Sequence, residues 1–295
     1  MKKAAKIHGI ILVLTCALAA PLKAQNLYVG TSANGVIGEY GLNGSTVNAS
    51  LISGLNVPQG IVIVGDDVFV ANFGSGIIGE YTTSGTTINA SLITGLGVVA
   101  GLAASGNDLF AVNQSKDVIG EYTTSGATVN ASLITGLNFP FGLAISGNDL
   151  FVHNGSANAI SEYGLNGSLV NASLITGLNT PTGIATAGND LFVSNYGSNT
   201  IGEYTTSGAV VNASLISGLN GPEGITISGN DLFVANSLTG TIGEYTTSGS
   251  TVNASLITGL GQPLLGIAIS QVPEPSTVSL IGLGTTALWL WQRRK

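Results

Sequence analysis

The sequence predicts an all-β protein, a six-bladed β-propeller, on three observations. A Glu-Tyr pair recurs with a constant period of 41 residues, and its six copies begin at Glu39, Glu80, Glu121, Glu162, Glu203 and Glu244. Each period contains four short runs rich in branched residues and separated by Gly, Asn and Ser, and none of them is a helix of useful length. The copies also fill almost the whole chain between two atypical ends. Four antiparallel strands in a unit of this length are typical of a propeller blade.

One repeat illustrates the expected strands. Gly183–Ala187 predicts a first strand, and Gly188-Asn-Asp190 predicts the turn after it. Leu191–Asn195 is apolar on both faces, as expected for a strand between neighbouring blades. Thr200–Thr205 contains the Glu-Tyr pair and predicts a third strand.

The fourth strand is expected at Val210–Ile216. Its residues alternate, with Val211 and Leu215 on one face and Asn212 and Ser214 on the other. This period of two predicts a half-exposed outer strand. The repeated Asn-Ala-Ser triplets then supply polar positions on outer strands, whose free edges carry no Lys, Arg or Pro to block pairing. Lateral association of propellers is a hypothesis that follows from these edges.

The two ends of the repeat region complement each other. The region begins with a second strand, Asn26–Val29, and ends with an isolated first strand, Gly266–Ser270. Together they would complete the sixth blade and close the ring. A β-solenoid, the alternative architecture, needs no such complement.

Charge and cysteine content exclude several function classes. Lys116 is the only basic residue among residues 25–271, which contain seven Asp and seven Glu. Such an acidic domain repels phosphate backbones, so we expect no nucleic-acid partner. The only cysteine, Cys16, lies near the N-terminus, so the propeller is expected to lack disulfides.

Residues 1–24 have the layout of a signal peptide. A Lys-rich start precedes an apolar run, Ile10–Ala20, and a small residue at Ala24. The run is too short to span a membrane, and export is the better interpretation. A lipoprotein signal through Cys16 is the weaker alternative, because the apolar run continues past the cysteine.

Residues 272–295 form a second atypical end. They comprise Pro273, Glu274 and Pro275, then the uncharged run Val278–Trp291, then Gln292-Arg-Arg-Lys295. A short hydrophobic helix is expected here, about 21 Å long, against a bilayer core of roughly 30 Å.

This C-terminal segment resembles the PEP-CTERM sorting signal of Gram-negative bacteria. The resemblance implies an exosortase-type protease as partner. It also implies transient anchoring in the inner membrane and delivery to the cell surface or an extracellular matrix. A simple tail anchor is the alternative, and whether the helix is removed stays open.

Residues 26–270 resemble NHL-type repeats. The resemblance is carried by units such as Pro222–Asn236 followed by Thr241–Tyr245. It implies a six-bladed propeller and leaves function open, because this fold hosts both enzymes and binding modules. WD40 repeats are disfavoured, since Trp289 and Trp291 both lie outside the repeats.

Variation between repeats points to a binding face. The loops between strands two and three, and from strand four to the next blade, vary most and emerge on one side of a propeller. Functional residues concentrate on loops over a rigid scaffold. The expected ligand-binding residues are Phe73, Lys116, Phe139, Phe141, His153, Tyr196 and Glu223. Drift in unconstrained loops is the alternative explanation.

No catalytic residue, cofactor or metal is assigned. His153 is the only histidine after the signal peptide, so neither a two-histidine metal set nor a Ser-His-Asp arrangement can be built. Six-bladed lactonases and related hydrolases hold calcium with Glu, Asn and Asp. In this chain a calcium site of that kind would require Glu223, Asp117 and the asparagines that end second strands. We expect these asparagines instead to cap the following turns.

The repeated Glu residues are expected to be solvated or backbone-bonded on each blade, although a ring of carboxylates could gather cations. Because the blades are nearly identical, we expect no cluster of unlike polar residues at a channel mouth. The sequence therefore favours an exported, non-catalytic surface or matrix propeller with a polysaccharide or protein ligand. The alternative is an envelope hydrolase or lyase with a metal at the channel mouth.

Overall fold

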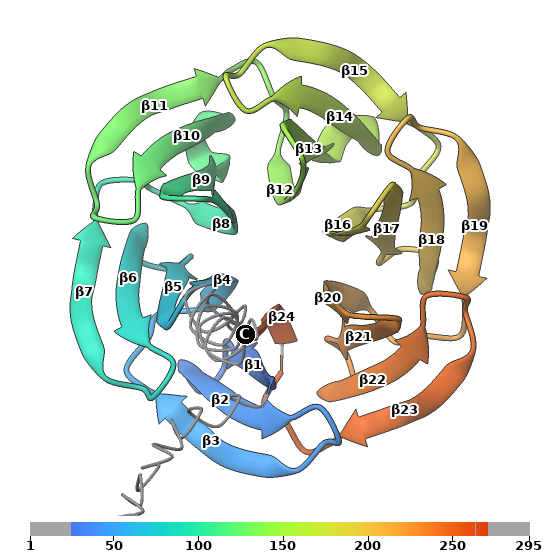
Figure 1. Cartoon of the computed structure of the whole chain (residues 1–295), viewed down its shortest axis with the longest axis horizontal. Coiled ribbons are helices and arrows are strands. Elements are labelled where there is room, and N and C mark those ends of the chain that lie inside the picture. The colour runs from blue at the N-terminus through green and yellow to red at the C-terminus, as the bar shows by residue number, and fades with distance from the viewer. Residues whose placement is uncertain (1–24, 263, 271–295) are drawn as a thin grey trace, which may run out of the picture. The chain divides into compact units, whose positions relative to one another are not determined.

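The computed structural model describes residues 25–262 and 264–270, and these form six four-stranded antiparallel sheets around a central axis (Figure 1). The six-bladed propeller expected from the sequence is thereby confirmed. The expected signal peptide and the expected C-terminal hydrophobic helix lie outside the described residues.

The blades use their strands in a constant order from the axis outward. The first strands are β4 (Pro58–Val64), β8 (Val99–Ser105), β12 (Pro140–Ser146), β16 (Pro181–Ala187), β20 (Pro222–Ser228) and β24 (Leu264–Ile269). The second strands are β1 (Asn26–Thr31), β5 (Asp67–Asn72), β9 (Asp108–Asn113), β13 (Asp149–Asn154), β17 (Asp190–Asn195) and β21 (Asp231–Asn236).

The outer half of each blade follows the same scheme. The third strands are β2 (Val36–Gly41), β6 (Ile77–Thr82), β10 (Val118–Thr123), β14 (Ala159–Gly164), β18 (Thr200–Thr205) and β22 (Thr241–Thr246). The fourth strands are β3 (Thr46–Ile52), β7 (Thr87–Ile93), β11 (Thr128–Ile134), β15 (Leu169–Ile175), β19 (Val210–Ile216) and β23 (Thr251–Ile257). Two short 3₁₀ helices, η1 (Gln114–Lys116) and η2 (Gly155–Ala157), follow second strands.

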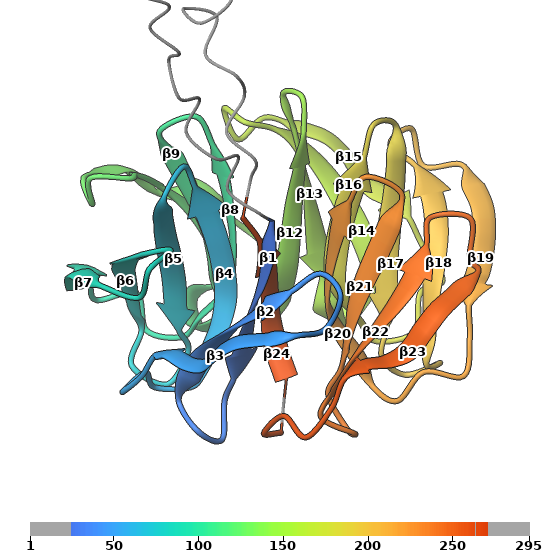
Figure 2. The ribbon, with the colours of Figure 1, turned by 60° about the horizontal axis from the view of Figure 1, so that its bottom comes forward.

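One blade is built from both ends of the domain. Its sheet has the order β24-β1-β2-β3, and we call it the closing blade. Figure 2 shows β24 beside β1 at the inner side of this blade. The complementary strands expected at the ends of the repeat region are therefore confirmed.

Aromatic residues pair across every blade interface. Each of six core clusters contains both the aromatic residue of a second strand and the Tyr of the next blade's Glu-Tyr pair. The pairs are Tyr28 with Tyr81, Phe69 with Tyr122, Phe110 with Tyr163, Phe151 with Tyr204, Phe192 with Tyr245, and Phe233 with Tyr40. Aromatic side chains bury the largest apolar areas, so this contact explains why the pair recurs.

The fourth strands differ from expectation. In β19 the first five residues are exposed, and Val211 is 54% exposed although an inward position was expected. Ile201 pairs with Ile216 but Glu203 pairs with Asn212, so two extra residues interrupt the ladder. The amide of Ser214 donates to Oδ1 of Asn212 at 3.1 Å, which turns the chain locally. The half-exposed alternation was therefore wrong, because the Asn-Ala-Ser triplet makes a bulge in place of regular pleating.

Candidate functional site

The centre of the ring is set by a bulge in each first strand. Pro140 pairs with Asn154 and Leu143 with Val152, so β12 has one extra residue between them. The same shift occurs in the other blades. A bulge re-aims side chains. Here it turns the residue before the strand's glycine toward the channel.

Glycine permits the first strands to approach at this point. A Cβ on Gly183 would collide with the carbonyl oxygen of Glu223 on the next strand, and one on Gly142 would collide with that of Thr182. Only a residue without Cβ fits so close to a neighbouring backbone. The glycine of the repeat is therefore required by the narrow centre of the ring.

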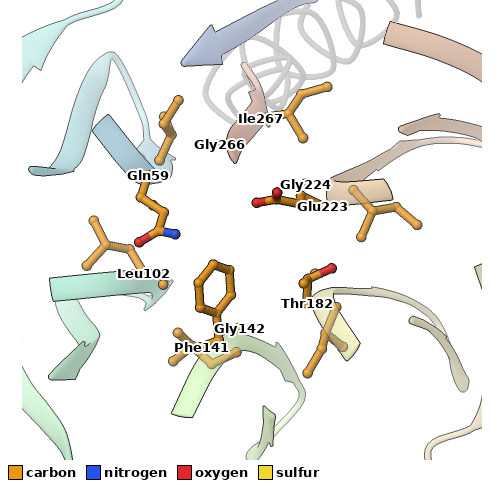
Figure 3. A pocket seen from close by; sticks show the side chains of 16 residues that line it. Gln59, Leu102, Phe141, Gly142, Thr182, Glu223, Gly224, Gly266 and Ile267 are labelled. Carbon is orange, nitrogen blue, oxygen red and sulfur yellow. The ribbon is translucent and has the colours of Figure 1, made fainter. Parts of the chain in front are cut away.

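Unlike side chains converge at the mouth of the channel (Figure 3). The residue before the glycine differs from blade to blade: it is Gln59, Ala100, Phe141, Thr182 or Glu223 in β4, β8, β12, β16 and β20. The mouth lined by these strands has a volume of about 100 Å³, and a ring of Ile and Leu side chains lies beside it. The expectation that no unlike polar residues would gather at a channel mouth was wrong, because sequence identity between blades fails at this inward position.

Glu223 is the charged group of the channel mouth. Burial raises the pKa of this carboxyl to about 7, while a hydrogen bond with Ser237 acts in the opposite direction. Lys116, the only Lys or Arg in the described residues, does not line the mouth. Glu223 therefore changes charge near neutral pH and can either accept or donate a hydrogen bond.

Gln59 and Thr182 supply neutral polar groups. Gln59 is only 7% exposed, and its Oε1 is buried without a hydrogen-bond partner among the described residues. The hydroxyl of Thr182 donates to the carbonyl of Pro222 at 3.0 Å, which leaves its oxygen able to accept. Unsatisfied buried polar atoms are rare in proteins, so Gln59 carries hydrogen-bonding capacity at the channel mouth that no described group uses.

A second pocket lies beside this mouth. It has a volume of about 270 Å³ and is lined by Phe139, Phe141, His153, Gly155, Ser156, Thr180, Pro181 and Thr182. Phe141 and Thr182 also line the channel mouth. We call this pocket the side pocket. Burial lowers the pKa of His153 to about 4, so its imidazole is neutral near pH 7.

The residues expected on the binding face are only partly brought together. Phe141 and Glu223 line the channel mouth, and Phe139, Phe141 and His153 line the side pocket. Lys116 is exposed at the end of η1, outside both sets of lining residues. Phe73 packs against a core cluster, and Tyr196 lies against Gly221. Neither of these two residues lines the channel mouth or the side pocket.

The residues considered for a metal site are dispersed. Oδ1 of Asp117 accepts a hydrogen bond of 2.8 Å from the amide of Phe139. Oδ1 of Asn195 accepts from the amide of Asn179, in the connection before the first strand of its blade. Equivalent bonds are made by Asn72, Asn154 and Asn236. These four asparagines fasten the preceding loop, so for them the expected capping of the following turn was wrong. Asn113 differs, because its Oδ1 accepts from Oγ of Ser115 in the following turn, as expected. Within residues 25–262 and 264–270, no group of three His, Cys, Asp or Glu side chains gathers.

The repeated glutamates lie far out on the blades, half-buried on third strands. In five blades burial and the Asp that opens the second strand raise the pKa of the Glu carboxyl. In the closing blade Asn26 takes the place of that Asp, and its Nδ2 donates to Oε1 of Glu39 at 2.7 Å. Glu39 thus has side-chain partners, Asn26 and Tyr28, which were not expected from the sequence.

Sequence reasoning missed Gln59 and Thr182. Both occupy the variable position of a Pro-x-Gly triplet, Pro58-Gln59-Gly60 and Pro181-Thr182-Gly183. Comparing that position across the repeats would have found them. They were not among the expected binding residues because those were sought in loops, whereas Gln59 and Thr182 lie at the start of strands.

Comparison with family models gives one match: residues 271–295 fit the PEP-CTERM protein-sorting motif. The chain therefore carries a sorting signal of exported proteins, and this signal implies recognition by exosortase-type processing. Pro273, Glu274 and Pro275 belong to this matched segment, outside the described residues. A search of curated proteins finds no significant match.

Several solved structures share the fold. One is a chain of a nidogen/laminin complex, with 20% identity, a TM-score of 0.69, and coverage of 84% of this chain and 99% of that one. Virginiamycin B lyase from Staphylococcus aureus gives 22% identity, a TM-score of 0.54, and coverage of 74% and 71%. A gluconolactonase from Xanthomonas campestris gives 14% identity and a TM-score of 0.59, with coverage of 72% of this chain and 85% of that one. At these identities the likeness concerns the fold alone.

In the part of the chain that the structure describes, no helix has the length and apolar character needed to cross a membrane.

Proposed function

We propose that this protein is an exported, non-catalytic propeller of the cell surface or extracellular matrix that binds a neutral polysaccharide at its channel mouth. The observation that carries the proposal is the convergence of Gln59, Phe141, Thr182 and Glu223 from four of the six blades on one opening. A scaffold that needed only stability has no reason to vary this one inward position.

The side chains suit a sugar. The face of an aromatic ring is electron-rich and packs well against the C–H face of a pyranose, and Phe141 offers such a ring. A carboxyl, an amide and a hydroxyl oxygen bind sugar hydroxyls, and few precisely placed polar groups are typical of ligand sites. The opening of about 100 Å³ admits one substituent of a sugar, so the ring itself would rest across the mouth.

The charge of the domain narrows the ligand further. Residues 25–271 contain fourteen acidic residues and one Lys. An anionic polymer would be repelled by this field. A neutral glycan experiences no such repulsion, and it can hydrogen-bond to Glu223 in either protonation state.

A hydrolase or lyase is the second candidate. Glu223, with a pKa raised to about 7, has the proton affinity of a general base. Two of the structures with this fold are named as a lyase and a gluconolactonase. Within the described residues, however, no second titratable side chain lines the channel mouth, so the binding role is preferred.

Glycan-array binding of the purified chain tests the proposal. Wild type should bind a neutral glycan, and Phe141→Ala and Glu223→Ala should each weaken that binding about tenfold or more. Leu238→Ala, an exposed residue outside the lining, is the matched control. Absence of binding, or equal binding by all variants, would reject the proposal, and turnover of a bound glycan would favour the enzyme.

Export rests on the two ends of the chain. We propose residues 1–24 as a signal peptide, residues 25–271 as the mature propeller and residues 272–295 as the removable sorting signal, with an exosortase-type protease as partner. The motif match at 271–295 supports this division. Mass spectrometry of the released protein is the test, and an intact Trp289-Leu-Trp291 end would reject removal of the signal.

A further inference from the structure

We propose that the side pocket receives the acetamido group of an N-acetylated sugar whose ring lies across the channel mouth. This inference rests on the proposed glycan binding and names the sugar class.

The side pocket exists because blade β12–β15 departs from the other five at two positions. Where Gly155 stands, the others have Ser32, Phe73, Gln114, Tyr196 and Ser237. Where His153 stands, they have Gly30, Ala71, Val112, Ser194 and Ala235. Gly155 leaves no side chain over the pocket, and His153 lies beneath it. The only histidine of the described residues is therefore placed where the covering side chain is missing.

His153 is an unusual group to bury. It is 5% exposed, and neither Nδ1 nor Nε2 has a hydrogen-bond partner among the described residues. An uncompensated buried polar group is costly, so its presence calls for an explanation. A ligand that hydrogen-bonds to the imidazole provides one, provided that the ring turns to present a nitrogen to the pocket, because both nitrogens are closed to solvent in this structure.

The walls of the side pocket select the group that can enter. Phe139, Phe141 and Pro181 give it a largely apolar lining, and Phe139 is 58% exposed at its entrance. An acetamido group presents a methyl to such walls and a planar amide with one donor and one acceptor. The neutral imidazole also has one donor and one acceptor, so it can bond to the amide. Charged substituents are disfavoured, because the histidine carries no charge and the lining offers no counter-ion.

The two openings are adjacent. Phe141 and Thr182 line both the channel mouth and the side pocket. A pyranose packed on Phe141 therefore has both openings within reach of its substituents. The 2-hydroxyl of a glucose unit would leave the side pocket of about 270 Å³ mostly unused, whereas an acetamido group would occupy it in part.

Two trisaccharides that differ only at C2 test the inference by calorimetry: triacetylchitotriose and cellotriose. Wild type should bind triacetylchitotriose about tenfold or more tightly, as expected when a site is built to hydrogen-bond one substituent. His153→Val removes the imidazole with a residue that Val112 already provides in another blade. Gly155→Phe places the side chain found at Phe73 over the pocket, and because its Cβ meets the carbonyl oxygen of Phe139, the local backbone must shift to accept it. Both variants should lose the preference and bind cellotriose as wild type does.

The outcomes separate the two proposals. If wild type binds both sugars equally, or if the preference survives in both variants, the acetamido inference is wrong and glycan binding stands. If wild type binds neither sugar while a glycan array shows another ligand, the inference is again wrong. If no glycan binds at all, the proposed function fails and this inference fails with it.

Discussion

The backbone amide of Asn26 donates a hydrogen bond of 2.9 Å to Oγ of Ser270, and the amide of Ser270 donates one of 3.0 Å to the carbonyl of Asn26. These residues stand 244 positions apart and belong to the two ends of the described domain. Their reciprocal bonds fasten β24 to β1 where the ring closes. A propeller whose last sheet is shared between both ends leaves neither end free to fray.

Ser270→Ala should therefore lower the free energy of unfolding. It removes the acceptor of the Asn26 amide, and loss of one such bond costs about 1 kcal/mol. Ser105→Ala is the matched control, since Ser105 ends an ordinary first strand. Urea unfolding measures both, and equal losses would mean that the closure bond has no special weight.

Glu223→Gln should change stability with a definite pH dependence. The pKa of Glu223 in the folded protein, about 7, lies above the ordinary value of 4.5. The folded state therefore favours the protonated carboxyl, and wild type loses stability as pH rises from 4.5 through 7. Above pH 8 the Gln variant should be the more stable by on the order of 1–3 kcal/mol. Thermal unfolding at pH 4.5 and 8.5 checks this, and a pH-independent difference would contradict it.

His153→Val should show the opposite sign. The pKa of the folded histidine, about 4, lies below its ordinary 6.5, so wild type loses stability as pH falls from 6.5 toward 4. Across that range wild type should lose on the order of 2–3 kcal/mol that the Val variant keeps. Denaturant titrations at pH 7 and 4 measure the difference. Parallel losses in both proteins would show that the imidazole is not buried as described.

Asn212→Ala tests the bulge of the outer strand. Oδ1 of Asn212 accepts from the amide of Ser214, so its removal frees a donor on an exposed edge. We expect a loss of about 0.5–1 kcal/mol and more self-association, because bulges and satisfied edges protect sheets from pairing. Asn212→Asp keeps the acceptor and is the control. Light scattering at rising concentration measures association, and unchanged scattering would assign no protective role to the bulge.

Lateral association of the propellers stays a prediction. Val210 is 64% exposed and Val211 54%, and corresponding Val and Ile residues are exposed around the ring. These residues favour pairing of edges, whereas the Asn-Ala-Ser bulge opposes it. Sedimentation of the wild-type protein would show which effect is the larger.

The repeat predicted the propeller for a physical reason. Glu-Tyr recurs because Tyr204 and its equivalents must fill the same interface between blades, and Gly183 and its equivalents must let first strands approach. Because the same contact between neighbouring blades occurs six times around the ring, the same residue types must recur at the same position of each repeat. The strands shared by the two ends were visible for the same reason, since a blade missing one strand needs that strand from elsewhere.

The candidate site was less visible in the sequence. Phe141, His153 and Glu223 were expected on a binding face and line the two openings, whereas Gln59 and Thr182 were missed. Phe73 and Tyr196, which were also expected there, line neither opening. Exposure of a loop residue depends on which neighbouring loop covers it, and that neighbour comes from another blade.

By itself, the sequence determined the six blades, the closing of the ring by both ends, the acidic surface and the sorting signal. Each of these features follows from a local pattern of residues along the chain or from its composition. Only the tertiary structure decided that Gln59, Thr182 and Glu223 meet, that Asp117 bonds to a loop, and that a pocket opens over His153. These relationships join residues from different blades. They depend on the narrow ring centre and on the bulge of each first strand, neither of which the spacing of residues along the chain reveals.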